Sequence, residues 1–270
     1  GIGRDFVSEA GKCLEVVSRQ DEKAVSGLID RAISEMSDSL CNMLRLAKVS
    51  PSIAELLRNA WKNSPPRRTT LSSCIDFGPE ELWQLCSLGN ISSLDVSHCV
   101  AFTDKELGFL LSSLPLLEEL DASGCHKVMF NIFGEEDGQE EKSESAGHSW
   151  PALKTLNVSE CPVTDGTVVR LCKSARNLTA IDLSRCNKLT STALHGTGVT
   201  ALASLTSISL NGCLKIDGTG FLAIANKCSA LKRVDFGGCA KLDDGVLRLI
   251  GLRLRNLTHL DVSSCTKITD

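Results

Sequence analysis

The sequence predicts an α/β solenoid, a curved stack of short parallel strands and helices built from about eight copies of one unit. A nine-residue segment, clearest at 91–99 as Ile-Ser-Ser-Leu-Asp-Val-Ser-His-Cys, recurs along the chain with small changes. Its cysteines are spaced 25, 26, 36, 25, 27, 26 and 26 residues apart, at Cys74, Cys99, Cys125, Cys161, Cys186, Cys213, Cys239 and Cys265. Such regular self-similarity is typical of solenoids, whose units must stack to bury their apolar faces.

Each copy is expected to start with a short strand. In the copy at 91–99, apolar Leu94 and Val96 alternate with Asp95. Because successive side chains of a strand point to opposite faces, we expect Leu94 and Val96 to point inward and Asp95 to point outward. The later copies keep the same alternation, which predicts one continuous sheet.

A helix is expected after each strand. A Thr or Asp follows each cysteine by a few residues, as in Phe102-Thr103-Asp104, and both residue types favour a helix N-cap. Apolar residues then recur at helical spacing. The two clearest stripes are Leu107, Leu110, Leu111 and Leu114, and Val246, Leu247, Leu249 and Ile250.

The repeat resembles the cysteine-containing type of leucine-rich repeat, whose units read roughly L-x-x-L-x-L-S-x-C-x-x-I-T-D-x-x-L. The resemblance covers residues 71–270 and is specific for fold but weak for function. It implies a horseshoe with parallel strands on the concave face and helices on the convex face. The same repeat type is found in F-box proteins, in which it forms the substrate receptor of a ubiquitin ligase.

The framework cysteines are interpreted as structural thiols. The sequence has no C-x-x-C motif, its five histidines are scattered, and a straight ladder of thiols cannot converge into the tetrahedral site that zinc prefers. Buried free cysteine commonly behaves as a small apolar side chain. A reduced ladder indicates an intracellular, reducing compartment, with the cytoplasm or nucleus favoured. We therefore expect no metal and no cofactor.

Composition indicates a protein partner. The net charge of −4 and pI near 5.8 argue against nucleic acid or an anionic membrane as the main partner. No apolar run approaches the roughly 18 residues of a membrane helix. The solenoid is expected over residues 65–270, and because the sequence stops within a copy of the repeat, we expect it to be C-terminally incomplete.

Residues 1–64 carry no repeat and are predicted to form an N-terminal helical cap over the end of the solenoid. Apolar stripes at helical spacing begin at Phe6 and Val25, and a third helix is expected from Ser52 after Pro51. No Leu-Pro-x-Glu motif of an F-box occurs in this segment. An F-box could lie upstream of this sequence, but its absence is favoured.

Residues 134–149 form an acidic insertion, predicted to be disordered, in the copy that is ten residues longer than its neighbours. The segment 134–146 has six acidic residues and one lysine, a net charge of −5. It could bind a basic partner or carry phosphorylation at Ser143 or Ser145. A tolerated surface loop is the favoured interpretation, because loop insertions cost little stability.

The outward strand positions form the candidate binding surface. We define the concave strip as the charged and amide-bearing residues at these positions: Asp95, Glu119, Asp121, Asn157, Asp182, Arg233, Asp235, His259 and Asp261. Regularly spaced aspartates on an open surface do not converge in a dry pocket, so catalysis is not expected. The sequence also lacks a glycine-rich phosphate loop, a Ser-His-Asp order and an H-E-x-x-H motif. No catalytic residue is assigned.

The function predicted from the sequence is a non-enzymatic scaffold that binds other proteins, as a structural or docking subunit of a larger assembly. The alternative, implied by the resemblance to F-box repeat proteins, is the substrate-recognition subunit of a ubiquitin ligase. An enzyme domain joined to the solenoid elsewhere in a longer chain is a third possibility.

Overall fold

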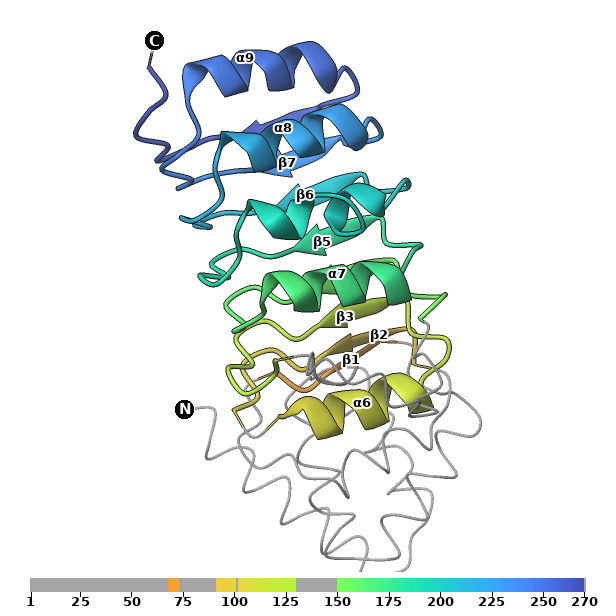
Figure 1. Cartoon of the computed structure of the whole chain (residues 1–270). Coiled ribbons are helices and arrows are strands. Elements are labelled where there is room, and N and C mark those ends of the chain that lie inside the picture. The colour runs from red at the N-terminus through yellow and green to blue at the C-terminus, as the bar shows by residue number, and fades with distance from the viewer. Residues whose placement is uncertain (1–67, 73–90, 101, 130–149, 270) are drawn as a thin grey trace, which may run out of the picture.

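A computed structural model of the chain describes residues 68–72, 91–100, 102–129 and 150–269. Over these ranges the backbone forms one open sheet of eight parallel strands, whose order in the sheet is their order in the chain. The predicted cap at 1–64 and the acidic insertion at 134–149, with Ser143 and Ser145, lie outside the described residues. The predicted α/β solenoid is confirmed for the remainder (Figure 1).

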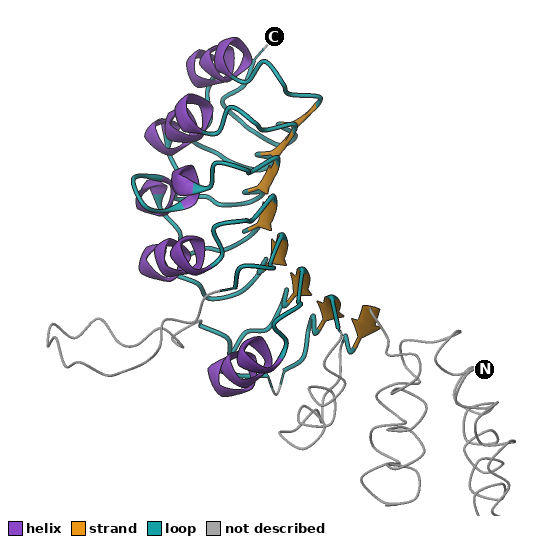
Figure 2. Ribbon diagram, turned by 90° about the vertical axis from the view of Figure 1, so that its right-hand side faces the viewer, coloured by secondary structure: helices purple, strands orange, loops and turns teal. Residues whose placement is uncertain are grey.

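Each strand is three residues long, and its central residue is aligned with the central residue of the next strand, as Leu94 is with Leu120. The strands are β1 (Arg68–Thr70), β2 (Ser93–Asp95), β3 (Glu119–Asp121), β4 (Thr155–Asn157), β5 (Ala180–Asp182), β6 (Ser207–Ser209), β7 (Arg233–Asp235) and β8 (His259–Asp261). The strands line the inner side of an arc and the helices its outer side (Figure 2).

The helices start where the sequence predicts them. They are α6 (Asp104–Ser113), α7 (Asp165–Ser174), α8 (Gly218–Lys227) and α9 (Asp244–Arg253), with 3-10 helices η2 (Ser191–Leu194) and η3 (Val199–Ala201). Each Thr or Asp before a helix accepts a hydrogen bond from a backbone N–H of its first turn, which would otherwise be unsatisfied. These N-caps are Thr103, Thr164, Thr190, Asp217 and Asp243.

The repeat between β5 and β6 differs because two short 3-10 helices replace its α-helix. Gly196 has a positive φ of 57°, and a Cβ at Gly198 would lie 2.0 Å from the carbonyl oxygen of Ala193. Two glycines within three residues also lower helix propensity. Leu194 and Val199 are nevertheless fully buried, so this repeat keeps its place in the core with a thinner convex layer.

The core is a continuous file of inward side chains. Leu183 and Leu210 are fully buried, as are the corresponding residues of the neighbouring repeats. The predicted stripe on α9 was wrong at Leu249, which is 39% exposed. The corresponding position of α6 holds Phe109, also 39% exposed, because this side of each helix faces away from the sheet. Leu260 of β8 is 40% exposed because no described repeat covers it.

The framework cysteines connect each repeat to the preceding one. Every described framework thiol donates a hydrogen bond to a backbone carbonyl of the previous repeat, at Sγ to oxygen distances of 3.1–3.3 Å. Cys186 Sγ, for example, donates to the carbonyl oxygen of Val158. The carbonyl oxygen of Val158 also accepts a hydrogen bond from the backbone N–H of Cys161 in its own repeat, so the thiol adds a second hydrogen bond, which links the two repeats. A structural role for these cysteines is therefore evident from their contacts.

Burial keeps these thiols protonated. Desolvation raises the pKa of Cys125 and Cys239 to about 12, and that of Cys161 and Cys213 to about 11. It also raises the pKa of Cys186. Because the thiolate is the reactive form of cysteine, these side chains are poor nucleophiles and poor metal ligands at neutral pH.

The residue before each framework cysteine has a left-handed backbone conformation. Its φ lies between 56° and 71° at His98, Gly124, Glu160, Arg185, Gly212, Gly238 and Ser264. At Gly124 the conformation coincides with a close approach, because a Cβ there would lie 2.2 Å from Nδ1 of His98. Other repeats hold larger residues in this conformation, so the lack of space beside the His98 ring is what distinguishes Gly124, whose left-handed φ also favours glycine.

Substitution of Gly124 by alanine is expected to lower the free energy of unfolding by about 1–3 kcal/mol, through the strained φ together with displacement of the His98 ring. Gly196→Ala is the matched control, because its φ is 57° but nothing lies within 4 Å of the added Cβ. Urea unfolding of both variants measures the difference. A Gly124→Ala variant no less stable than Gly196→Ala would show that the contact with His98 is unimportant.

Candidate functional site

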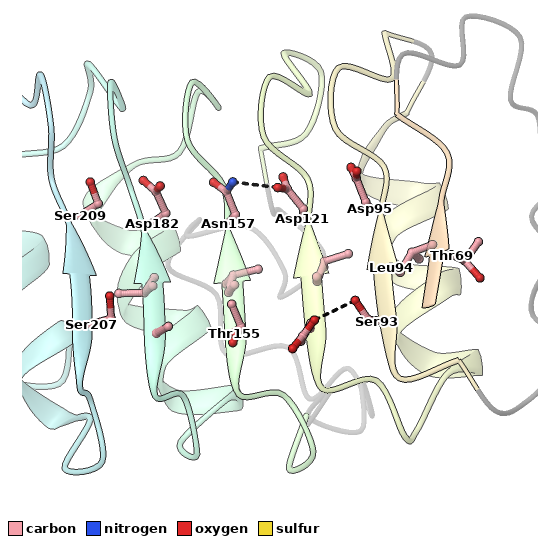
Figure 3. A pocket seen from close by; sticks show the side chains of 15 residues that line it. Thr69, Ser93, Leu94, Asp95, Asp121, Thr155, Asn157, Asp182, Ser207 and Ser209 are labelled. Carbon is pink, nitrogen blue, oxygen red and sulfur yellow. Dashed lines mark hydrogen bonds between the residues drawn. The ribbon is translucent and has the colours of Figure 1, made fainter. Parts of the chain in front are cut away.

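The outward strand residues form two parallel rows on the concave face. The first residues of successive strands make one row and the third residues make the other, with the buried central residue between them. Figure 3 shows Ser93, Thr155 and Ser207 in the first row, and Asp95, Asp121, Asn157, Asp182 and Ser209 in the second. The predicted orientation of the concave strip is confirmed by this arrangement, although its role in binding stays a prediction.

The aspartates of the second row have a structural function that the sequence analysis missed. Asp95 Oδ1 accepts a hydrogen bond from the backbone N–H of Ser97 at 2.9 Å, closing a turn at the end of the strand. The same bond, to the N–H two residues further on, recurs at Asp121, Asn157, Asp182, Asp235 and Asp261. Short acidic and amide side chains commonly make such turns. Their recurrence in the repeat therefore does not by itself indicate binding.

Two neutral residues interrupt this acidic row. Asn157 stands next to Asp121 and donates from Nδ2 to Asp121 Oδ2 at 2.9 Å. Ser209 stands between Asp182 and Asp235, and its hydroxyl donates to Asp235 Oδ2 at 3.2 Å. Neighbouring strands lie about 4.8 Å apart, so an unbroken row of carboxylates would suffer repulsion at every step. Asn157 and Ser209 relieve that repulsion and add contacts between repeats.

A shallow hollow of about 640 Å³ occupies the concave face from β1 to β6 (Figure 3). Its lining contains four carboxylates, Asp95, Glu119, Asp121 and Asp182, and no Lys, Arg or His. The other polar groups are short hydroxyl and amide side chains, such as Thr155 and Ser207. Ser93 donates to Glu119 Oε2 at 2.8 Å, which orients this carboxylate across the first row. The hollow therefore offers an acidic floor with few bulky side chains.

The other members of the concave strip, on β7 and β8, lie outside the hollow. Arg233 and His259 occupy the first row and are exposed. Asp261 is also exposed, and hydrogen bonds from Ser263 lower the pKa of its carboxyl group. The strip is thus one continuous surface with two electrostatic parts, acidic over the early repeats and mixed over the last two.

Over the described strands, the carboxylates of the concave face do not converge in an enclosed pocket. The carboxylates face solvent along a curved sheet, and their hydrogen bonds go to turns and neighbouring strands. Among the described residues, no group of three or more His, Cys, Asp or Glu side chains could hold a metal ion. No described helix is long and apolar enough to cross a membrane. What the arrangement can do is present polar groups along an extended surface.

A family model described as "Leucine Rich repeat" matches residues 253–270, the last described helix end and strand. A chain from the crystal structure of the complex of Rad7 and Elc1 in yeast superimposes with a TM-score of 0.55 at 18% sequence identity. This likeness covers 87% of the present chain and 68% of the other chain. The chain folds as a leucine-rich-repeat solenoid.

A second solved structure, the complex of TLR13 with ssRNA13, has a TM-score of 0.42 and 20% sequence identity. That likeness covers 67% of this chain and only 27% of the longer chain. The fold that this chain shares with the chain from the Rad7 and Elc1 complex supplies the concave sheet on which a binding surface can be built.

Proposed function

We propose that this leucine-rich-repeat chain is a non-enzymatic scaffold that binds another protein through the hollow on its concave face. The observation that carries the proposal is the hollow itself, about 640 Å³ in volume and open across six strands. Extended curved surfaces of this kind suit contact with a large partner, whereas small-molecule sites are enclosed and mostly apolar. The structural likeness to a chain from the Rad7 and Elc1 complex supports membership of a protein assembly.

Two finer assignments belong to this proposal. The thiol contacts between repeats fit the cysteine-containing type of leucine-rich repeat, in which the thiols stay reduced, and so favour an intracellular, reducing compartment. The second candidate function is the substrate-recognition subunit of an F-box type ubiquitin ligase, which the resemblance to F-box repeat proteins implies. In that case the same hollow would receive the substrate. The two functions share one surface and differ in the partner.

Binding through the hollow can be tested by blocking the hollow with large side chains. A Thr155→Arg, Ser207→Arg double variant puts two long cationic side chains on the floor and should displace a partner that occupies it. Its matched control is Thr197→Arg, Ala201→Arg, which adds the same charge at exposed positions between β5 and β6, outside the hollow. Affinity purification followed by quantitative mass spectrometry compares both variants with the unmodified protein.

Proteins bound through the hollow should be retained by the control and depleted about tenfold or more from the floor variant, because bulky charged residues at the centre of an interface cost several kcal/mol. Enrichment of ubiquitin-ligase subunits that persists in the floor variant, with loss of other proteins, would support the second function. Equal retention of every protein by all three chains would contradict binding through the concave hollow.

A further inference from the structure

Charge is distributed unevenly along this chain. Residues 150–269 contain 15 Lys and Arg against 8 Asp and Glu, a net charge of +7, although the whole chain carries −4. The last two repeats hold a group of these cations at the side of the solenoid where each helix ends and the next strand begins. We define the basic edge as these five exposed residues: Lys227, Lys232, Arg233, Arg253 and Arg255.

Contacts between the last two repeats bring the basic edge together. Arg253 at the end of α9 donates from Nη1 to Asn226 Oδ1 at 2.6 Å, which places its guanidinium beside the end of α8 and Lys227. The carbonyl oxygen of Lys232 accepts hydrogen bonds from the backbone N–H groups of Thr258 and His259, at 2.8 and 3.0 Å. The five cations therefore lie on adjoining repeats along one side of the solenoid.

The residues of the basic edge lack ion-pair partners among the described side chains. Within the part of the chain that the structure describes, its side-chain nitrogens form no ion pair with a carboxylate, and the two ion pairs seen are Lys154–Glu118 and Arg185–Glu160. Asp235, which lies on the same strand as Arg233, already accepts hydrogen bonds from Gly237 N, Asn211 Nδ2 and Ser209 Oγ. The five cations are thus exposed and form no ion pair among the described residues.

The opposite side of the same repeats is built differently. There Lys215, Lys241 and Lys267 alternate with the acidic residues at the helix starts, Asp217, Asp243 and Asp244. Mixed charge is the ordinary state of a solvated surface, whereas a concentration of one sign attracts a partner of the other. The separation of charge between the two sides therefore distinguishes the basic edge from a general excess of lysine and arginine.

We propose that the basic edge binds an acidic segment of a protein partner, at a surface distinct from the concave hollow. Charge complementarity requires that the partner's contact surface is negatively charged. A nucleic acid fits less well, because the two described phenylalanines of these repeats, Phe221 and Phe236, are fully buried and cannot stack on bases. Asp235 and Asp261 on the adjoining strands would also repel a continuous phosphate backbone.

The test uses a fluorescently labelled peptide of about ten alternating glutamate and serine residues, long enough to cross the edge in extended form. Fluorescence anisotropy at low ionic strength gives its Kd for the unmodified chain. Lys232→Glu with Arg255→Glu should weaken binding about tenfold or more, because two attractive charges become repulsive. Added salt should weaken binding of the unmodified chain in the same direction.

Lys215→Glu with Lys267→Glu is the matched control, since both residues are exposed, lie on the opposite side of the same repeats and change the net charge equally. The control should bind the peptide within about twofold of the unmodified chain. Equal weakening by both pairs would show that only net charge matters and would overturn the proposal. The proposal would also fail if a single-stranded RNA of equal length bound the chain at least about tenfold more tightly than the peptide does, and if Lys232→Glu with Arg255→Glu abolished that binding.

Discussion

The free energy of unfolding is expected to fall steeply as the pH rises above about 9, because the buried thiols ionise readily only in the unfolded chain. Burial raises the pKa from an ordinary 9.0 to about 11 or 12 at Cys125, Cys161, Cys172, Cys213, Cys228 and Cys239. A raised folded-state pKa means that the associated stability is complete below pH 9 and is lost as the pH approaches the folded value.

Between these pH values each such thiol lowers stability by about 1.4 kcal/mol per pH unit, and six acting together by about 8 kcal/mol per unit. A domain stable by about 5–15 kcal/mol would unfold before pH 11. Circular dichroism follows unfolding, and thiolate absorbance follows ionisation without interference from tyrosinate, because the sequence has no Tyr. The two transitions should coincide. Ionisation of the thiols in a chain that stays folded would contradict their burial.

The Cys172→Ala variant provides the control for the alkaline transition. Cys172 is buried in α7 and its pKa is raised to about 12, so its removal takes one thiol out of the titration. The small cavity that this substitution creates lowers the stability at neutral pH. The slope of stability against pH should become shallower by about 1.4 kcal/mol per unit. An unchanged slope would mean that other groups dominate the alkaline transition.

Leu183→Ala is expected to lower the free energy of unfolding by about 2–5 kcal/mol, because Leu183 is fully buried in the file of inward side chains. Its neighbour Asp182 points outward, and the Asp182→Ala change should cost only about 1 kcal/mol. That smaller cost arises from the turn, in which Asp182 Oδ1 accepts from the backbone N–H and the hydroxyl of Ser184 at 2.8 and 2.5 Å.

Urea unfolding of the two variants at pH 7 measures both costs. Comparable losses from Leu183→Ala and Asp182→Ala would mean that the inward and outward assignment of β5 is incorrect. A Leu210→Ala variant repeats the experiment on the next repeat, where the leucine is equally buried and the outward strand residue is Ser209.

The framework of the fold could be predicted because each repeat restates it. The position of Leu183 relative to Cys186 recurs in every copy, so strand orientation, helix start and thiol burial follow from one unit. The replacement of the α-helix by 3-10 helices near Gly196 and Gly198 could not be predicted in this way, because it depends on the close approach of Gly198 to the backbone of Ala193. Such approaches are a property of packing and leave no periodic signal.

The candidate site was predicted less completely. Side-chain direction in the concave strip followed from alternation, but the turn formed by Asp95 and its counterparts required knowledge of the backbone after the strand. The basic edge was missed because its members come from different positions of two repeats. Arg233 alone belongs to an outward strand position, whereas Arg253 and Arg255 lie at a helix end and in the following loop. Only stacking places these positions together.

The regular spacing of the strands also sets a length scale along the concave face. Each repeat advances the sheet by one strand spacing of about 4.8 Å, so the eight strands together measure roughly 34 Å from the first to the last. An extended peptide lying across the strands would need about ten residues to cover that distance. Insertion or deletion of one whole repeat would therefore change the length of partner that fits by one or two residues, without altering the chemistry of any single contact.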